Sequence, residues 1–116
     1  MKVFVYGTLM RGEPAHGLLG EARFLGATRT EPRYTLVLLD GYPGLLEGGD
    51  TSVAGELYEL PDDEALLREL DRYEDAPELY ARELQRFGEH EAWVYLLRPE
   101  HADGRAPIAS GDWRRR

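Results

Sequence analysis

Two short stretches of the chain carry residue types that could do chemistry. The first is the run Tyr6, Gly7, Thr8 and Leu9, which follows the apolar residues 3–5. A strand that ends at glycine can turn sharply, because glycine tolerates backbone angles that other residues avoid. The amides of Gly7, Thr8 and Leu9 would then point together into a concavity able to hold a carboxylate or a developing oxyanion. A plain turn between a strand and a loop is the alternative interpretation.

The second stretch is residues 70–75, with the sequence Leu-Asp-Arg-Tyr-Glu-Asp. If a helix runs from about residue 62 to residue 73, Glu74 lies at its C-terminal end, where the helix dipole disfavours an anion by ~0.3–1 kcal/mol at exposed sites. Asp71 and Asp75 add like-charge repulsion. Both effects raise the pKa of Glu74 and favour a carboxylate that takes and returns a proton near neutral pH. The alternative is a surface helix that simply ends in acidic residues.

Other familiar constellations are missing from the sequence. His16, His90 and His101 lie at no metal-ligand spacing, and the chain has no cysteine, so we expect neither a metal site nor a disulfide. The serines and threonines occupy no nucleophile elbow. The early glycines are five residues apart, which matches neither a dinucleotide fingerprint nor a phosphate-binding loop. We therefore expect no cofactor.

The chain is acidic, and its acidity is uneven. Its 116 residues carry a formal net charge of −8, with a pI near 4.8. Residues 56–78 alone hold ten carboxylates and two arginines, a local charge of −8. Proteins that bind phosphate backbones usually present a basic face, so a nucleic-acid partner is not expected.

Length and composition indicate one globular domain over residues 1–116. Hydrophobic residues make up 42% of the chain, but no apolar run approaches the ~20 residues that a membrane helix needs. The first residues do not resemble a secretory signal, because Gly7 and Thr8 interrupt the apolar stretch. We therefore expect a cytoplasmic protein without a membrane segment.

The hydrophobic pattern predicts the elements that must position both stretches. Alternating apolar residues indicate strands, the first of them central, and leucines at helical spacing indicate one main helix after the acidic residues 62–64. The sequence predicts strands over residues 3–6, 22–30, 34–39, 52–60, 79–87 and 92–97, a short helix over 15–19, and turns at 40–44, 47–50 and 88–91. Runs of strands with few helices favour the α+β class, here a small mixed, mostly antiparallel β-barrel of six to seven strands. Residues 99–116 are expected to form an irregular tail that Trp113 pins to the body.

Taken together, these motifs resemble those of the gamma-glutamylcyclotransferase-like proteins, in particular the AIG2-like and gamma-glutamylamine cyclotransferase branch. The likeness covers nearly the whole chain. Its motifs are Val3-Phe4-Val5-Tyr6-Gly7-Thr8-Leu9 with Arg11-Gly12, Gly55-Glu56-Leu57-Tyr58, Leu70-Asp71-Arg72-Tyr73-Glu74, Leu79-Tyr80-Ala81-Arg82, Ala92-Trp93-Val94-Tyr95 and Ser110-Gly111-Asp112-Trp113-Arg114. Each motif alone is weak, whereas their ordered succession is specific.

The resemblance implies a mixed β-barrel with flanking helices. It also implies a small-molecule substrate, a γ-glutamyl amine or amide, whose glutamyl group cyclises to 5-oxoproline and releases the free amine. By the same resemblance, the loop from Tyr6 to Leu9 binds the glutamyl group through backbone amides, Glu74 is the general acid and base, and Tyr80 and Tyr95 line the pocket. The resemblance implies no metal, nucleotide or cysteine.

Other functions stay open on the sequence alone. The same barrel could bind a small amide, a carboxylate or a protein partner without catalysis. The same pocket could also serve an isopeptidase or an epimerase. If the enzyme is a cyclotransferase, the acidic segment around Glu74 predicts that γ-glutamyl derivatives of polyamines, lysine or an amino-sugar are better substrates than γ-glutamyl dipeptides with a free carboxylate.

Overall fold

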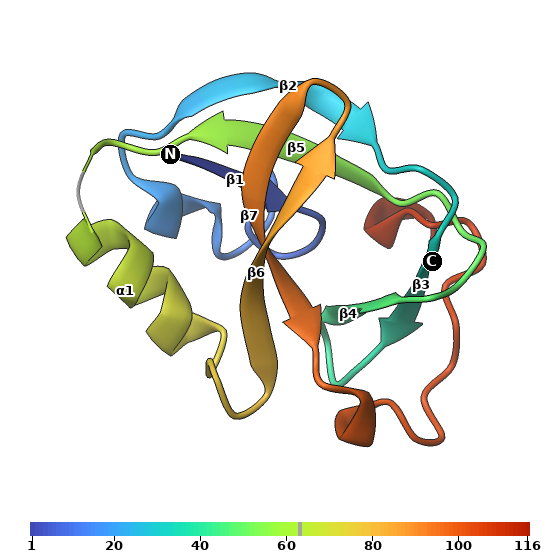
Figure 1. The fold of residues 1–116 in the computed structure, drawn as a ribbon. Coiled ribbons are helices and arrows are strands. Elements are labelled where there is room, and N and C mark those ends of the chain that lie inside the picture. Colours follow the sequence, from blue (N-terminus) through green and yellow to red (C-terminus); the bar gives the residue numbers. More distant parts are fainter. Residues whose placement is uncertain (63) are drawn as a thin grey trace.

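One curled β-sheet and one α-helix make up most of the structure, a computed structural model that describes residues 1–62 and 64–116. Asp63, which the sequence places at the start of the main helix, lies outside the described residues. The strands are β1 (Lys2–Val5), β2 (Arg23–Arg29), β3 (Tyr34–Leu38), β4 (Pro43–Glu47), β5 (Ala54–Glu59), β6 (Tyr80–Phe87) and β7 (His90–Leu97); the helix is α1 (Glu64–Tyr73), and three 3-10 turns are η1 (His16–Leu19), η2 (Pro99–His101) and η3 (Trp113–Arg115). Figure 1 shows α1 to one side of the sheet. The expected α+β class is confirmed.

Strand β7 organises the sheet. In the described residues the strand order is β2-β5-β1-β7-β4-β3, and β6 pairs with β7 as a hairpin. Four pairings are antiparallel, whereas β1 and β4 each run parallel to β7. These two strands meet different parts of β7, because Val3 lies opposite Trp93 and Leu45 lies opposite Leu96. We call the point where β1 and β4 separate along β7 the split.

The first strand is central, as its sequence predicts. β1 lies between β5 and β7, and Val3, Phe4 and Val5 are all almost completely buried. A strand covered on both faces needs apolar residues at successive positions rather than at alternate ones. The Phe4 ring stacks on Phe87 of β6 with centroids 4.3 Å apart, which ties β1 to the hairpin as well.

Strand β4 was not placed from the sequence, and the prediction of a turn over the whole of residues 40–44 is wrong. Pro43 and Gly44 look like turn residues, but they are the first two residues of β4. Proline is tolerated at the first position of a strand because no ladder hydrogen bond is lost there. Gly44 is needed for close packing, since a Cβ atom at this position would lie 2.7 Å from Cδ2 of Leu97.

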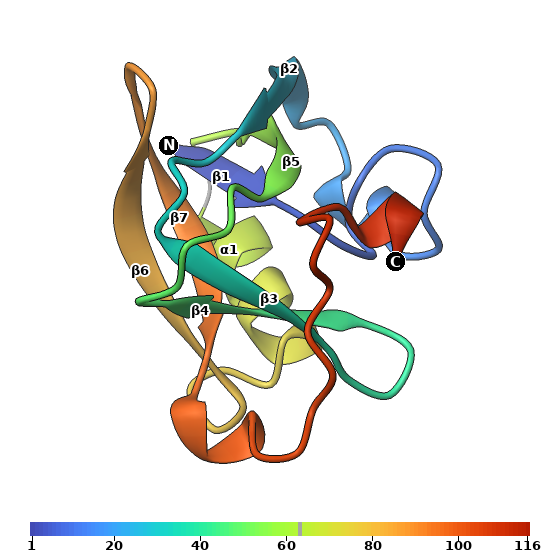
Figure 2. The same ribbon diagram turned by 90° about the vertical axis from the view of Figure 1, so that its right-hand side faces the viewer.

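The C-terminal tail runs back over the body of the protein (Figure 2). It contains η2 and η3, and it forms a bridge from Pro107 to Val37 of β3. The expectation for Trp113 is confirmed: its side chain is buried, and its indole N–H donates a hydrogen bond of 3.0 Å to Glu13. Within the described residues, no helix has the length and apolar character needed to span a membrane.

Candidate active site

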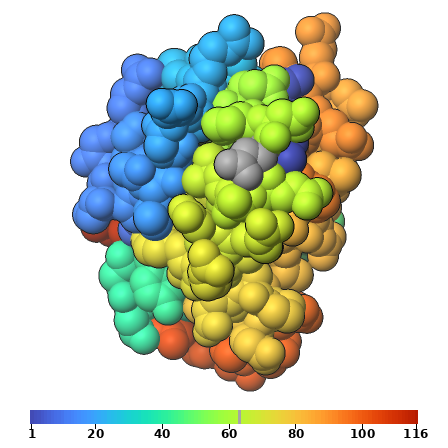
Figure 3. Space-filling model, turned by 90° about the vertical axis from the view of Figure 1, so that its left-hand side faces the viewer, coloured from blue at the N-terminus to red at the C-terminus, as the bar shows by residue number. Residues whose placement is uncertain are grey.

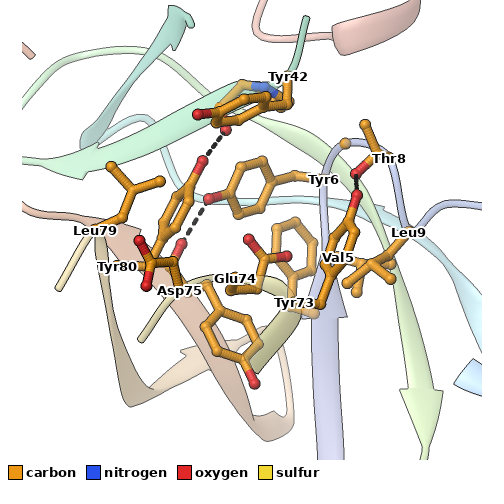
Figure 4. A pocket seen from close by; sticks show the side chains of 14 residues that line it. Val5, Tyr6, Thr8, Leu9, Tyr42, Tyr73, Glu74, Asp75, Leu79 and Tyr80 are labelled. Carbon is orange, nitrogen blue, oxygen red and sulfur yellow. Dashed lines mark hydrogen bonds between the residues drawn. The ribbon is translucent and has the colours of Figure 1, made fainter. Parts of the chain in front are cut away.

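A pocket of about 320 Å³ opens at the split. This volume falls in the range of small-molecule sites. The walls come from the loop after β1, the start of β4, the segment after α1, and strands β6 and β7 (Figure 4). The lining residues are Phe4, Val5, Tyr6, Gly7, Thr8, Leu9, Tyr42, Pro43, Tyr73, Glu74, Asp75, Leu79, Tyr80 and Tyr95. The structure thus brings together every residue that the sequence nominated for the site: Tyr6, Gly7, Thr8, Leu9, Glu74, Tyr80 and Tyr95.

Three buried tyrosines form the floor of the pocket. The Tyr6 hydroxyl donates a hydrogen bond of 2.5 Å to the backbone carbonyl of Tyr95, which lies between the two strand partners of β7. The Tyr80 hydroxyl donates to the carbonyl of Pro43 at 2.6 Å. A buried carbonyl without a donor is costly, so these hydroxyls complete the backbone hydrogen bonding at the split. Tyr6 therefore contributes to the sheet although β1 ends at Val5.

Gly7 is required by a close contact and not by its backbone angle. A Cβ atom at this position would lie 2.5 Å from Cγ and 2.7 Å from Cδ of Pro43. Gly7 does not adopt a positive φ, so the expectation that glycine's angular freedom explains the turn is wrong. The absence of a side chain instead lets the end of β1 pass directly against the start of β4, which places both on the same pocket.

At the start of the loop after β1, the backbone carbonyls are engaged in hydrogen bonds, whereas the amides of Gly7, Thr8 and Leu9 donate none within the described residues. The carbonyls of Gly7 and Thr8 accept hydrogen bonds from amides further along the same loop, at 3.0 and 2.9 Å. The Leu9 carbonyl lies 2.9 Å from Nδ1 of His16. Among the hydrogen bonds of the described chain, none is donated by the amides of Gly7, Thr8 or Leu9, and all three residues border the pocket. Free amides of this kind can bind an anion or a developing oxyanion.

The backbone after α1 fixes the position of Glu74. The helix ends in a Schellman motif: Asp75 adopts φ = 52°, its amide bonds to the carbonyl of Arg72 at 3.2 Å, and the amide of Ala76 bonds to the carbonyl of Asp71 at 2.9 Å. Glycine is usual at this left-handed position, and aspartate is among the residues that tolerate it best. The motif makes Glu74 the C-cap residue directly after α1, with its side chain in the pocket (Figure 4).

Burial raises the pKa of Glu74 from its ordinary value of 4.5 to about 7. The direction agrees with the sequence-based expectation, but the expected cause is wrong. Asp71 does not act as a nearby unpaired charge, because its carboxylate accepts hydrogen bonds from Arg82 at 2.8 Å and from the Tyr95 hydroxyl at 2.7 Å. The apolar and aromatic surroundings of the pocket, rather than like charges, disfavour the ionised form of Glu74.

The floor tyrosines remain protonated near neutral pH. Burial raises the pKa of Tyr6, Tyr80 and Tyr95 above its usual value. A second contribution to the raised pKa of Tyr95 is its hydrogen bond to the carboxylate of Asp71. These hydroxyls therefore act as hydrogen-bond donors, whereas Glu74 has the pKa of a group that can exchange a proton at neutral pH.

The rim of the pocket includes residues that the sequence patterns did not nominate. The Tyr73 hydroxyl lies 2.7 Å from Oγ1 of Thr8, which joins the end of α1 to the loop after β1. The two regions are neighbours on one face of the molecule (Figure 3). Tyr42 and Pro43 also line the pocket, and the sequence does not indicate this because Pro43, which begins β4, lies in a stretch of turn-forming residues. The signal present in the sequence was the pair Tyr42-Pro43, an aromatic residue followed by proline within a stretch of turn-forming residues.

The charged side chains among the described residues that line the pocket are acidic. Among its described lining residues there is no lysine, arginine or histidine, and the charged groups are the carboxyls of Glu74 and Asp75. The described residues also contain no cluster of three or more histidine, aspartate or glutamate side chains that could hold a metal ion. A bound carboxylate would therefore have to be held by neutral donors, namely the free loop amides and the hydroxyl groups at the rim, because the floor tyrosines already donate their protons to protein acceptors.

Comparison with known proteins adds to this geometry. The family model for gamma-glutamyl cyclotransferase, AIG2-like, matches residues 3–115, which is nearly the whole chain. The chain belongs to the AIG2-like family.

Relatives within the AIG2-like family are similar over long stretches. The chain is 43% identical over 111 residues to a Vibrio cholerae protein, covering 96% of this chain and 93% of the relative. It is also 43% identical over 93 residues to the human gamma-glutamylaminecyclotransferase, covering 72% of this chain but only 60% of the human protein. The solution structure of the Escherichia coli protein ytfP superposes with a TM-score of 0.76 at 36% identity, covering 97% and 96% of the two chains.

Proposed function

We propose that this member of the AIG2-like family is a gamma-glutamylcyclotransferase, which converts a γ-glutamyl amine into 5-oxoproline and the free amine. The observation that carries this proposal is the position of Glu74, a carboxyl group with a pKa of about 7 in the same pocket as the free amides of the loop after β1. The human relative is named a gamma-glutamylaminecyclotransferase, which supports the same class of substrate.

The proposed substrate binds with its γ-carbonyl oxygen facing the amides of Gly7, Thr8 and Leu9. The α-amine then faces Glu74, and the leaving amine points to the rim near Asp75. Because the lining holds no cation, the glutamyl carboxylate is bound by neutral donors. Holding the flexible glutamyl chain folded in this way places the amine beside its own carbonyl, and such proximity supplies a large part of the rate enhancement of an intramolecular reaction.

Glu74 activates the α-amine. An α-ammonium group has a pKa of about 8. A carboxylate with a pKa of about 7 lies within about one pH unit of that value. An ordinary glutamate, with a pKa of 4.5, would be a much weaker base for the same proton. Burial of Glu74 therefore brings the proton transfer close to balance, which is the condition under which general base catalysis is most effective.

The bond changes follow from this arrangement. Glu74 removes a proton from the α-ammonium, and the free amine attacks the γ-carbonyl carbon to form the five-membered ring. The carbonyl oxygen becomes an oxyanion that the loop amides stabilise. As the C–N bond to the leaving amine breaks, protonated Glu74 donates to its nitrogen. The lactam nitrogen keeps one hydrogen, so two protons pass in all from the α-ammonium to the released amine, which leaves as an ammonium ion.

The proposed function is tested by incubating the protein with a panel of γ-glutamyl amines and measuring release of 5-oxoproline by mass spectrometry. Turnover that requires Glu74 is the expected result. If the folded protein instead bound a γ-glutamyl amine or 5-oxoproline in this pocket without turning over any member of the panel, the activity would be refuted and a non-catalytic binding function would take its place.

The acidic rim predicts which amines leave best. Glu74 and Asp75 attract a leaving group that carries a second positive charge, so we expect γ-glutamyl derivatives of a diamine or of lysine to react about 10-fold faster in kcat/KM than a neutral amine of equal length. The preference is expected to shrink as salt is raised, because ions screen charges at an exposed rim. Equal kcat/KM values for both amines at low salt would contradict this selectivity without affecting the proposed reaction.

Asp75→Asn provides a matched variant for this test. Asparagine tolerates the left-handed backbone of position 75 as well as aspartate does, so the Schellman motif is expected to persist. The variant should lose most of the preference for the cationic amine while its kcat/KM for the neutral amine changes by less than about 2-fold. An unchanged preference would show that Asp75 does not set the selectivity.

A further inference from the structure

We infer that Glu56 is a positioning residue, which together with Arg114 of the C-terminal tail fixes the loop of residues 7–13 in the geometry that presents its amides to the pocket. Neither side chain lines the pocket, so both would act through the loop. The kinetic part of this inference rests on the proposed cyclotransferase function.

Glu56 is a buried carboxylate with no role in the proposed chemistry. It is only 6% exposed, and it lies on β5 opposite Val5, the last residue of β1 before the loop. Its Oε1 atom accepts a hydrogen bond of 2.8 Å from the backbone amide of Arg11 and one of 2.9 Å from the Tyr58 hydroxyl. A buried charge is tolerated only with such partners. Glu56 of β5 therefore holds the loop through the backbone amide of Arg11, two residues beyond the last free amide, that of Leu9.

The C-terminal tail also contacts the backbone of Arg11, at its carbonyl group. The guanidinium group of Arg114 lies 3.6 Å from Oε2 of Glu56 and 3.5 Å from Oε2 of Glu13, and it donates a hydrogen bond to the backbone carbonyl of Arg11. The Trp113 indole donates to the other oxygen of Glu13. Arg11 is thus held through its amide by the sheet and through its carbonyl by the tail.

This arrangement explains why two sequence motifs far from the pocket accompany the catalytic ones. Residues 55–58 supply the carboxylate, and residues 110–114 supply the guanidinium and the indole. Glu56 and Arg114 both bind the backbone of Arg11, so this positioning of the loop does not require the Arg11 side chain. A displacement of about 1 Å at the loop would move the amides away from the oxyanion, and errors of that size can cost as much as about 10²-fold in rate.

Glu56→Gln tests the inference with little change of shape. Glutamine keeps an oxygen that can accept the hydrogen bond from the Arg11 amide, but it turns an NH2 group toward Arg114 and loses the ion pair. The interactions that hold the loop are therefore weakened rather than removed. We expect kcat/KM for a γ-glutamyl amine to fall about 10-fold, with part of the loss in kcat. The pKa read from the pH dependence should stay the same, because Glu56 does not line the pocket that contains Glu74. Glu59→Gln on the same strand is the control: Glu59 pairs with the N-terminal amine, 2.9 Å away, and should leave kcat/KM unchanged.

Amide hydrogen exchange gives a readout that does not depend on turnover. In Glu56→Gln the hydrogen-bonded amides of residues 10–15 should exchange at least about 5-fold faster than in wild type, while the amides of β1, β5 and β7 keep their protection. Arg114→Gln should give the same pattern. Arg115→Gln should not, because the side chain of Arg115 is largely exposed and its ion pair among the described residues is with Asp112, inside the tail.

The outcomes separate the inference from the proposed function. Wild-type kcat/KM in Glu56→Gln and Arg114→Gln, or unchanged exchange in residues 10–15, would overturn the positioning role. Faster exchange spread over the whole sheet would overturn it as well, since Glu56 would then be a general stabilising residue. If the wild-type protein turned over no γ-glutamyl amine, the proposed function would fail, and the exchange comparison alone would decide whether Glu56 and Arg114 fix the loop.

Discussion

Replacing Glu74 by glutamine is expected to lower kcat/KM for a γ-glutamyl amine by about 10²–10⁴-fold, which is the usual contribution of a general base. Glutamine has nearly the same shape as glutamate but cannot take a proton. The loss should appear in kcat as much as in kcat/KM, because proton transfer belongs to the transition state. Glu78→Gln, four residues further on and outside the pocket, is the matched control and should keep wild-type kinetics. Turnover in Glu74→Gln within about 3-fold of wild type would refute this mechanism.

The pH dependence of the wild-type enzyme gives an independent check. The base must be ionised, so kcat/KM is expected to rise with pH and to level off above the pKa of Glu74, about 7. An ordinary glutamate would give the same rise near pH 4.5. A kcat/KM that stays flat between pH 5.5 and pH 8, measured with a substrate whose own ionisation is known, would show that another group acts as the base.

The Glu74→Gln variant should be more stable than wild type at high pH. The folded-state pKa of Glu74 lies above the unfolded value, so between about pH 4.5 and pH 7 the folded protein binds more protons than the unfolded chain. Its free energy of unfolding therefore falls as pH rises through this range. Glu74→Gln lacks that loss, and we expect it to exceed wild type at pH 8 by about 1–3 kcal/mol but not at pH 4. Urea unfolding at the two pH values measures the difference.

Gly7→Ala is the second substitution with a large expected effect. The new methyl group would lie 2.5 Å from Cγ of Pro43, so the loop after β1 and the start of β4 must move apart. Such overpacking typically costs about 1–3 kcal/mol of stability. Because the displaced backbone carries the free amides, we expect kcat/KM to fall by about 10²-fold even in the folded fraction. Kinetics normalised to the folded protein, with the melting temperature measured alongside, separate the two effects.

Gly17→Ala is the matched control for this substitution. A Cβ atom at position 17 meets no other atom within 4 Å, and Gly17 has no positive φ. Alanine there should leave both stability and kcat/KM close to wild type. If Gly7→Ala behaved like Gly17→Ala, the loop amides would not be the group that stabilises the oxyanion.

Six strands and the position of Glu74 at the end of the helix could be predicted because their signals are local. The alternation of apolar residues is visible in a short window, as is the acidic end of the helix that places Glu74. Strand β4 could not be predicted in this way, because Pro43 and Gly44 are strand residues only by virtue of what they pack against. Missing β4 also hid Tyr42 from the pocket.

The causes of the raised pKa of Glu74 and of the requirement for glycine at position 7 were likewise out of reach of the sequence. The raised pKa of Glu74 comes from burial, and burial depends on side chains from strands far away in the chain. Asp71, whose charge the sequence-based explanation invoked, is paired with Arg82. Gly7 was nominated for its backbone freedom, whereas the requirement comes from Pro43, 36 positions later. Local patterns thus indicate candidate residues, but the surroundings of these residues are set by the tertiary structure.

The split along β7 has a consequence for the order in which the protein acquires its site. The Tyr6 hydroxyl and the Tyr95 carbonyl that meet there are 89 positions apart. A ribosome adds ~5–20 residues per second, so the first strand waits roughly 5–20 s for its partner. During that time the growing chain holds the loop residues, and later Glu74, without a pocket between them. The pocket, which Tyr95 helps to line, is therefore completed only when β7 joins the sheet.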